Sequence, residues 1–172
     1  MNQKRKQTLL KGKLIMPTRE VMQATVEIIN DACASLNQRN TVYISPAIIP
    51  IECQANFEVQ VVDGGCAYRD LEGGVRSEHF NLLIAIFTRY QLDSGQKYAN
   101  QLRDINHSIF ELKEKIIIAL DGSFCQKTSF DDVLLTRPLR VTSENPVQTY
   151  TQFKGLLMKR LVFLGGINNV RT

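Results

Sequence analysis

The pattern of hydrophobic and polar positions between Phe57 and Leu120 predicts two strands followed by an amphipathic helix. Phe57, Val59 and Val61 alternate with polar residues, which is the two-residue period of a strand with one apolar face. The run FNLLIAIFTRY at 80–90 is apolar on both faces, as expected of a strand inside a sheet or at a subunit interface. After a polar turn, apolar residues recur every three or four positions and form one helical stripe: Leu102, Ile105, Ile109, Leu112, Ile116 and Leu120.

The segment DGGCAYRDLEGGVRSE at 63–78 joins the two strands and contains four glycines. It is too long for a simple hairpin turn, and connections of this length are commonly functional or disordered. Tyr68 and Leu71 give it apolar side chains to bury. We therefore expect a projecting arm or an extended hairpin that orders against a partner, and the alternative is a floppy surface loop.

The rest of the chain supplies the other elements of one domain. A helix is expected from Thr18 to residues 37–40, with an apolar face at Val21, Thr25, Ile28, Ile29, Ala32 and Leu36. Short strands are expected at 41–45 and at 133–141, where Pro138 indicates an edge or a bulge. The run at 148–166 is strand-like throughout. The fold class predicted is α+β: a mostly antiparallel β-sheet packed by two main helices, within a single domain at 18–172.

The charge is concentrated in the arm at 1–17, which precedes this domain. Residues 1–13 contain no acid and five basic residues, whereas the whole chain has a formal net charge of +4, so the remainder sums to about −1. A nearly neutral body argues against a dedicated nucleic-acid-binding fold, which would show a basic face. The arm is a candidate contact for DNA or a partner, although such a terminus is more often a solvated tail: Lys4, Arg5, Lys6, Lys11 and Lys13.

No apolar run approaches the length of a membrane span; the longest, LLIAIF at 82–87, is as long as a strand. The first residues also lack the sustained apolar segment of a signal peptide. We therefore expect no membrane partner and residence in a cytosol.

The residue types that carry chemistry do not form a recognisable pattern. The four cysteines have no C-x-x-C pair and no zinc-ligand spacing, so we expect buried or incidental thiols: Cys33, Cys53, Cys66 and Cys125. His79 and His107 are interpreted as structural or surface residues. The Gly64-Gly65 and Gly73-Gly74 pairs are not followed by the residues of a phosphate-binding loop.

Acidic residues do not change this picture. Asp131 and Asp132 are adjacent in a polar segment, which favours a turn or a helix cap over paired acid–base catalysis. The acids at 63–72 match no EF-hand spacing. The sequence therefore predicts no catalytic residue, no cofactor and no metal site, and it indicates a structural protein more than an enzyme.

Three passages of the chain resemble the tail terminator proteins of long-tailed bacteriophages, also called head–tail joining or tail completion proteins. The first is the strand with a proline-rich exit, TVYISPAIIP. The second is the pair FEVQVV and NLLIAIFTRY, joined by the loop with Tyr68, Arg69 and Asp70. The third is the helix DINHSIFELKEKIIIAL, which ends at Asp121-Gly122, together with the closing strand MKRLVFL. The likeness covers residues 18–164, and the arm and the long segment at 124–150 exceed the compact pattern.

The resemblance implies a subunit of a six-membered ring. Such a ring caps the finished tail tube, stops its polymerisation and presents a surface to the head-completion, or stopper, protein. The partners it implies are further copies of this chain, the tail tube protein, the stopper protein and genomic DNA that passes through the lumen without sequence-specific binding. The location it implies is the tail or neck of the virion, and the host cytoplasm during assembly.

For the loop, the expectation is that Tyr68, Arg69, Asp70 and Leu71 contribute to subunit or tube contacts, since aromatic and aliphatic anchors dominate interface energetics. Three alternatives remain at this point. The chain could be a nucleic-acid-associated protein that binds through its basic arm, another neck or connector protein, or a small enzyme of unrecognised type.

Overall fold

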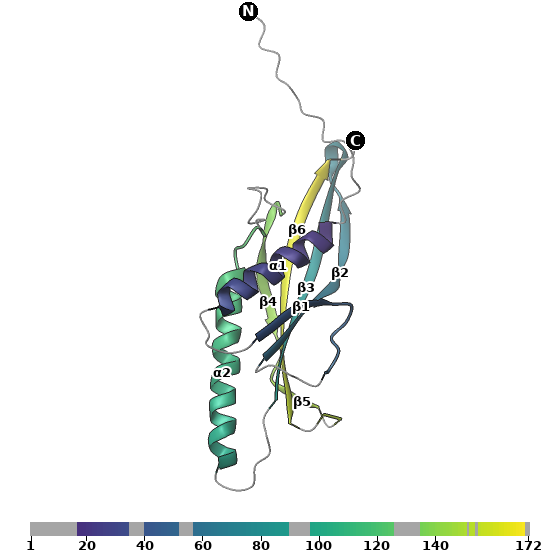
Figure 1. The fold of residues 1–172 in the computed structure, drawn as a ribbon. Helices are drawn as coiled ribbons and strands as arrows, with labels where there is room; N and C mark the ends of the chain where they lie inside the picture. Colours follow the sequence, from purple (N-terminus) through teal and green to yellow (C-terminus); the bar gives the residue numbers. More distant parts are fainter. Residues whose placement is uncertain are drawn as a thin grey trace, which may run out of the picture.

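The computed structural model describes residues 17–34, 40–51, 57–89, 97–125, 135–150, 152–153 and 155–170, with the backbone alone at residues 17, 40, 89, 97–108 and 169–170. The described chain forms two α-helices, a six-stranded sheet and one 3₁₀ turn, η1 (Figure 1). In chain order they are α1 (Pro17–Cys33), β1 (Asn40–Ser45), β2 (Phe57–Asp70), η1 (Glu72–Gly74), β3 (Val75–Arg89), α2 (Lys97–Leu120), β4 (Arg137–Glu144), β5 (Gln148–Tyr150) and β6 (Leu156–Val170).

The strands are ordered β1-β2-β3-β6-β4, and β5 pairs with the first residues of β6. Only β1 and β2 run parallel, and every other pairing is antiparallel. β3 lies between β2 and β6 over its whole length, which explains why its sequence is apolar on both faces. The predicted fold class is confirmed.

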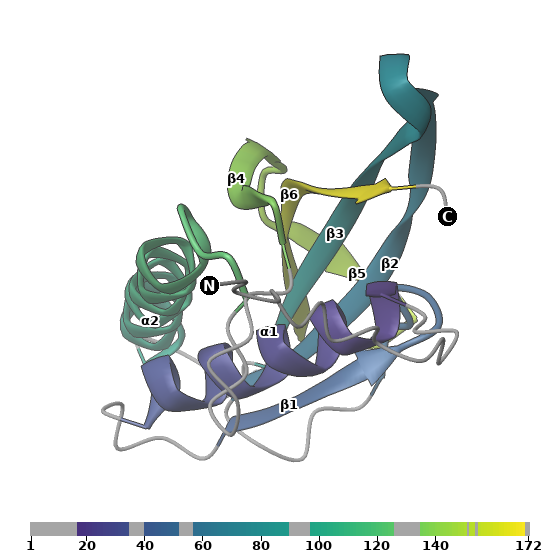
Figure 2. The ribbon, with the colours of Figure 1, turned by 90° about the horizontal axis from the view of Figure 1, so that it is seen from above.

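Both helices lie on one face of the sheet (Figure 2). The stripe of α2 is buried as predicted where its side chains are described, at Ile109, Leu112, Ile116 and Leu120. In α1 the predicted face buries Val21, Thr25 and Ile29, but the helix ends at Cys33, before the predicted 37–40. Leu36, Leu102 and Ile105 fall outside the described side chains.

The opposite face of the sheet is covered, at the end where β5 lies, by residues 46–51, which follow β1, and by the turn after β5. Ile48, Tyr150 and Phe153 pack there against buried residues of β3 and β6. Gln60 of β2 fastens the crossing segment: its side chain accepts a hydrogen bond from the Ile49 nitrogen at 2.9 Å and donates one to the Ile49 oxygen at 2.7 Å. This pairing satisfies an amide that is only 1% exposed.

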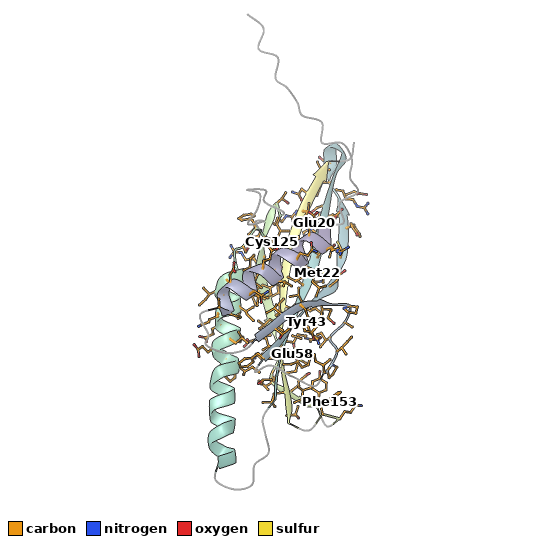
Figure 3. The ribbon with its side chains drawn as sticks, in the orientation of Figure 1. Glu20, Met22, Tyr43, Glu58, Cys125 and Phe153 are labelled. Atoms are coloured by element: carbon orange, nitrogen blue, oxygen red, sulfur yellow. The ribbon has the colours of Figure 1, made fainter. Side chains whose placement is uncertain are left out.

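Alternation in β2 therefore has a different meaning from the one that the sequence suggests. Glu58 and Gln60 are 7% and 1% exposed, although their polarity predicts a solvent-facing side. The Tyr43 hydroxyl, on the neighbouring strand, lies 3.4 Å from the Glu58 Oε2 and 3.0 Å from the Gln60 Nε2. Tyr43 and Glu58 are labelled in Figure 3. The second face of β2 is therefore buried as well, because other segments cover it and supply hydrogen-bond partners for its polar side chains.

Two predicted strands are also corrected. The strand-like run at 148–166 is two strands, because a turn with Gly155 at φ +80° interrupts it. Phe153 consequently packs against the cluster that contains Leu156 and Met158. It lies at the β5 end of the sheet (Figure 3). β4 spans 137–144 and not 133–141, and its register shifts around Pro138, as expected of a bulge.

The predicted loop at 63–78 is an extended hairpin that turns through residues 71–74. Gly64 and Gly65 form a bulge opposite Asn81, where a Cβ on Gly64 would lie 2.9 Å from the Asn81 Cβ. β6 accompanies the hairpin to Val170, so the projection has three strands. We call its residues 66–80 and 165–170 the finger. It extends beyond α1 (Figure 1).

Candidate functional site

The two faces of the finger carry different residues of the predicted site. Residues directly opposite one another on neighbouring strands share a face. Tyr68 and Asp70 stand opposite Glu78 and Arg76, on the face that continues the helix-covered side of the sheet. Arg69 stands opposite Ser77, on the other face. The predicted quartet therefore does not form one surface, because alternation along β2 divides it and Leu71 lies at the tip.

Tyr68 is held in place although it is 57% exposed. The guanidinium carbon of Arg76 lies 4.3 Å from the centroid of its ring, a cation–π contact. A hydrogen bond with the Cys66 thiol raises the pKa of the Tyr68 hydroxyl. The ring is thus a pre-oriented apolar surface, which lowers the entropy lost when a partner covers it.

Leu71 begins the turn at the tip. Its backbone nitrogen donates a hydrogen bond to the Val75 oxygen at 2.8 Å, which closes the turn. Gly73 and Gly74 have φ values of +78° and +75°, a region that glycine enters without strain. The Leu71 side chain is 36% exposed. The tip therefore presents an aliphatic group on a defined backbone.

A polar cluster lies on the opposite face of the finger. The Arg137 side chain extends from β4 over Gly166, where a Cβ would lie 3.4 Å from the Arg137 Cδ. Its Nη2 donates to the Ser77 Oγ at 2.8 Å and to the Asn168 Oδ1 at 3.3 Å. Its Nη1 lies 3.1 Å from the His79 Nε2. One guanidinium thus bridges β4, β6 and β3.

The same cluster contains a serine and a histidine in contact, since the Ser77 Oγ lies 3.1 Å from the His79 Nε2. This distance suits a nucleophile and its base, but the surroundings do not. Ser77 is 1% exposed, and its oxygen already accepts a hydrogen bond from Arg137. The arrangement favours a structural role for His79.

A second charged cluster lies between α2 and the sheet. The Glu144 Oε2 is 3.3 Å from the Lys113 ammonium and 3.5 Å from the Lys159 ammonium. Lys159 is 4% exposed, and both lysines approach the Phe110 ring within 6 Å, at 5.7 and 5.6 Å. Desolvation opposes ionisation of Glu144, but the two ammonium groups outweigh it, so the pKa of that carboxyl is lowered. Lys159 is therefore buried as one member of an ion pair.

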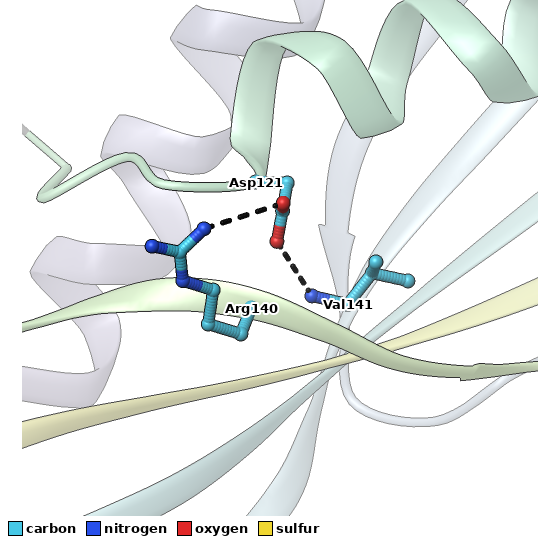
Figure 4. Close-up of polar contacts among 3 residues, drawn as sticks. All are labelled: Asp121, Arg140 and Val141. Carbon is cyan, nitrogen blue, oxygen red and sulfur yellow. Dashed lines mark hydrogen bonds and ion pairs between the residues drawn. The ribbon is translucent and has the colours of Figure 1, made fainter.

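Asp121 joins the end of α2 to the outer edge of β4 (Figure 4). Its Oδ1 accepts a hydrogen bond from the Val141 nitrogen at 3.0 Å, and its Oδ2 lies 3.4 Å from the Arg140 Nη1. Gly122, at φ +89° as expected of the C-terminal cap, donates to the Leu139 oxygen at 2.8 Å. The Leu139 nitrogen donates to the Ser123 oxygen. The edge of β4 at 139–141 is therefore already paired.

Several predicted residues lie outside the described chain: Lys4, Arg5, Lys6, Lys11, Lys13, Cys53, Asp131 and Asp132, together with the side chain of His107. Within the described chain, Cys33, Cys66 and Cys125 are free thiols. In the same residues no group of three or more His, Cys, Asp or Glu could hold a metal ion. None of the described helices is long and apolar enough to span a membrane.

Sequence reasoning did not single out Arg137, Asn168 or Glu144. Arg137 lies 58 residues from His79 in the chain, and only the pairing of β3, β6 and β4 brings them together. No local spacing signals such a contact. The one indirect signal is the Gly165-Gly166 pair inside a strand, since glycine there often marks a close approach by another group.

Comparison of the sequence with known protein families found no family that matches it, and comparison with curated proteins found no match either.

Proposed function

We propose that this chain is a structural subunit of the neck of a long-tailed bacteriophage. It assembles into a six-membered ring that caps the tail tube, ends its polymerisation and joins the tail to the head-completion complex. The genome passes through the lumen of the ring. The resemblance of the sequence to tail terminator proteins and the α+β fold with its long hairpin both support this proposal.

The finger is the observation that carries the proposal. It projects past the helices and carries two large apolar side chains, Tyr68 and Leu71, which are 57% and 36% exposed. Their conformations are fixed by the Arg76 contact and by the closed turn. An apolar group on a rigid projection is suited to insertion into a neighbouring subunit, because little entropy remains to be lost on binding.

The paired edge of β4 limits how such a ring forms. A ring built by continuing the sheet from subunit to subunit needs two open edges on each copy. At residues 139–141 the outer edge of β4 is occupied by residues 121–123. The proposed ring therefore does not continue the sheet through residues 139–141 of β4, and we place the contact in the finger side chains, against a different surface of the next subunit, a heterologous interface.

The test is the mass of the assembly in solution and its image by electron microscopy, for the protein alone and with tail tubes. We expect rings from the natural chain and monomers from the Tyr68→Ser/Leu71→Ser variant, with an unchanged circular dichroism spectrum. Ile118→Ser is the matched control, because it removes an apolar side chain that is 80% exposed on α2. A ring lost with Ile118→Ser and kept by the finger variant contradicts the finger contact. A monomer at every concentration, with and without tubes, contradicts the proposed function.

A further inference from the structure

The face of the finger that carries Arg137 has an unbalanced positive charge. The described residues on this face include Arg69, Ser77, His79, Arg137 and Asn168, and none of them is acidic. The carboxylates of the finger lie elsewhere: Asp70 and Glu78 are on the opposite face, and Glu72 is in the tip turn. The charge of this surface therefore comes from two guanidinium groups.

Among the described residues, the side chains that position the Arg137 guanidinium include no carboxylate. Its contacts in the described part of the chain are the Ser77 hydroxyl, the Asn168 amide oxygen and the His79 ring. These contacts fix its direction without neutralising its charge, whereas Arg140, three residues along the same strand, is paired with Asp121. Gly166 provides the room for the side chain to cross β6. An exposed, oriented arginine is a preorganised donor for an oxyanion.

Arg69 places a second positive charge beside the first. It is exposed and stands opposite Ser77, the residue to which Arg137 donates its shortest hydrogen bond. Two like charges on one face repel each other, so an anion that contacts both is favoured. Arg69 comes from β2 and Arg137 from β4, and β3 and β6 lie between these two strands. An extended polyanion, which sums several weak contacts, is the better match.

We propose that this face of the finger binds the phosphate backbone of double-stranded DNA. The most exposed aromatic ring of the finger, Tyr68, lies on the opposite face, Phe80 is buried, and the His79 ring on this face is held by Ser77 and Arg137, so the described residues offer no freely exposed ring here for the stacking that single-stranded binding uses. The contacts are to phosphates and carry no base readout. The inference rests on the proposed function, since it assigns the lumen-facing surface of the ring, and it places DNA contact on the folded domain as well as on the basic arm.

The experiment measures binding of the full-length protein to a labelled DNA duplex by fluorescence anisotropy over a range of salt concentrations. Arg69→Gln and Arg137→Gln are each expected to weaken binding several-fold at low salt. Each substitution makes the negative slope of log K against log salt shallower by about 1, and the double variant makes it shallower by about 2. Arg137→Lys, which keeps the charge, retains the slope.

Two controls separate the surface from the rest of the chain. Arg19→Gln removes an exposed arginine from α1, on the helix side of the sheet, and leaves affinity and slope unchanged. Lys11→Gln/Lys13→Gln tests the arm. Arg69→Gln alters an exposed side chain, so the folded state persists and circular dichroism confirms it. The inference is overturned if the double variant binds as Arg19→Gln does, if only the arm variant loses affinity, or if single strands bind more tightly than the duplex.

The mass of each variant distinguishes this inference from the proposed function. Rings that form normally but bind duplex DNA independently of Arg69 and Arg137 overturn the inference alone. Arginine-dependent binding by a protein that never forms a ring overturns the proposed function alone.

Discussion

The finger and the helix-covered base of the same sheet are stabilised in different ways. The base buries Ile84, Ile86, Leu161 and Phe163 completely beneath α1 and α2. Among the described side chains of the finger, the buried core ends with Phe80 and Ile167, and the residues beyond them are ordered by strand pairing, a cation–π contact on one face and the Arg137 bridge on the other. Apolar burial in the helix-covered base stabilises the fold. The finger is an extension of the same strands, and its exposed groups are positioned by that pairing.

This difference predicts that substitutions in the base change global stability, whereas substitutions at the finger tip change assembly. Tyr68 and Leu71 are exposed, so their replacement costs about 0.5 kcal/mol or less in the free energy of unfolding. The three changes below test the contrast, from the largest expected effect to the smallest.

Phe163→Ala is expected to be the most damaging, because the ring is 0% exposed and lies in the centre of the base. Truncation of a buried phenylalanine costs about 3–5 kcal/mol. Urea unfolding followed by circular dichroism measures the loss. Leu164→Ala, the next residue of β6, is the control: its side chain is 37% exposed on the other face, so it should cost much less. Equal losses would mean that the two faces are equally buried.

Alkaline pH should lower the free energy of unfolding through Cys125, a fully buried residue just after α2 in the helix-covered part of the molecule. Burial raises the pKa of this thiol from 9.0 to about 11. The unfolded chain therefore loses the proton first, and stability present below pH 9 falls as the pH rises toward 11. Two units correspond to about 2–3 kcal/mol.

Urea midpoints measured between pH 8 and pH 11 test this effect. Cys125→Ala removes the titrating group and should flatten the profile in that window, even though the variant is less stable at pH 8. A profile of the same steepness in both proteins would assign the alkaline loss to other groups.

Gly65→Ala should destabilise the strand pairing where the finger begins, next to residue 66. Gly65 has φ +93° and no heavy atom within 4 Å of the position of an added Cβ, so the cost is that of the backbone alone, about 1–2 kcal/mol. Hydrogen exchange at the amides of residues 66–70 should become faster, while exchange in α2 is unchanged. Gly65→Asn, which tolerates positive φ better, should lose less. Faster exchange throughout the molecule would show that finger and base open together.

Most of the architecture could be predicted from local patterns. The stripe of α2, the central position of β3 and the glycine that ends α2 each follow from a period or a residue type that acts within a few positions. The boundaries were less predictable. A break at Gly155 requires a left-handed backbone, and the apolar residues on both sides of it conceal the turn.

The candidate site divides in the same way. The sequence by itself determined that a long, glycine-containing segment with Tyr68 and Leu71 joins the two strands, and it favoured a projecting hairpin over a surface loop, since length and residue type are local properties. Only the tertiary structure decided which side chains share a face. The bulge at Gly64-Gly65, the register of three strands and the crossing of Arg137 over Gly166 bring distant residues together. Such contacts depend on pairing between strands, which no spacing along one strand encodes.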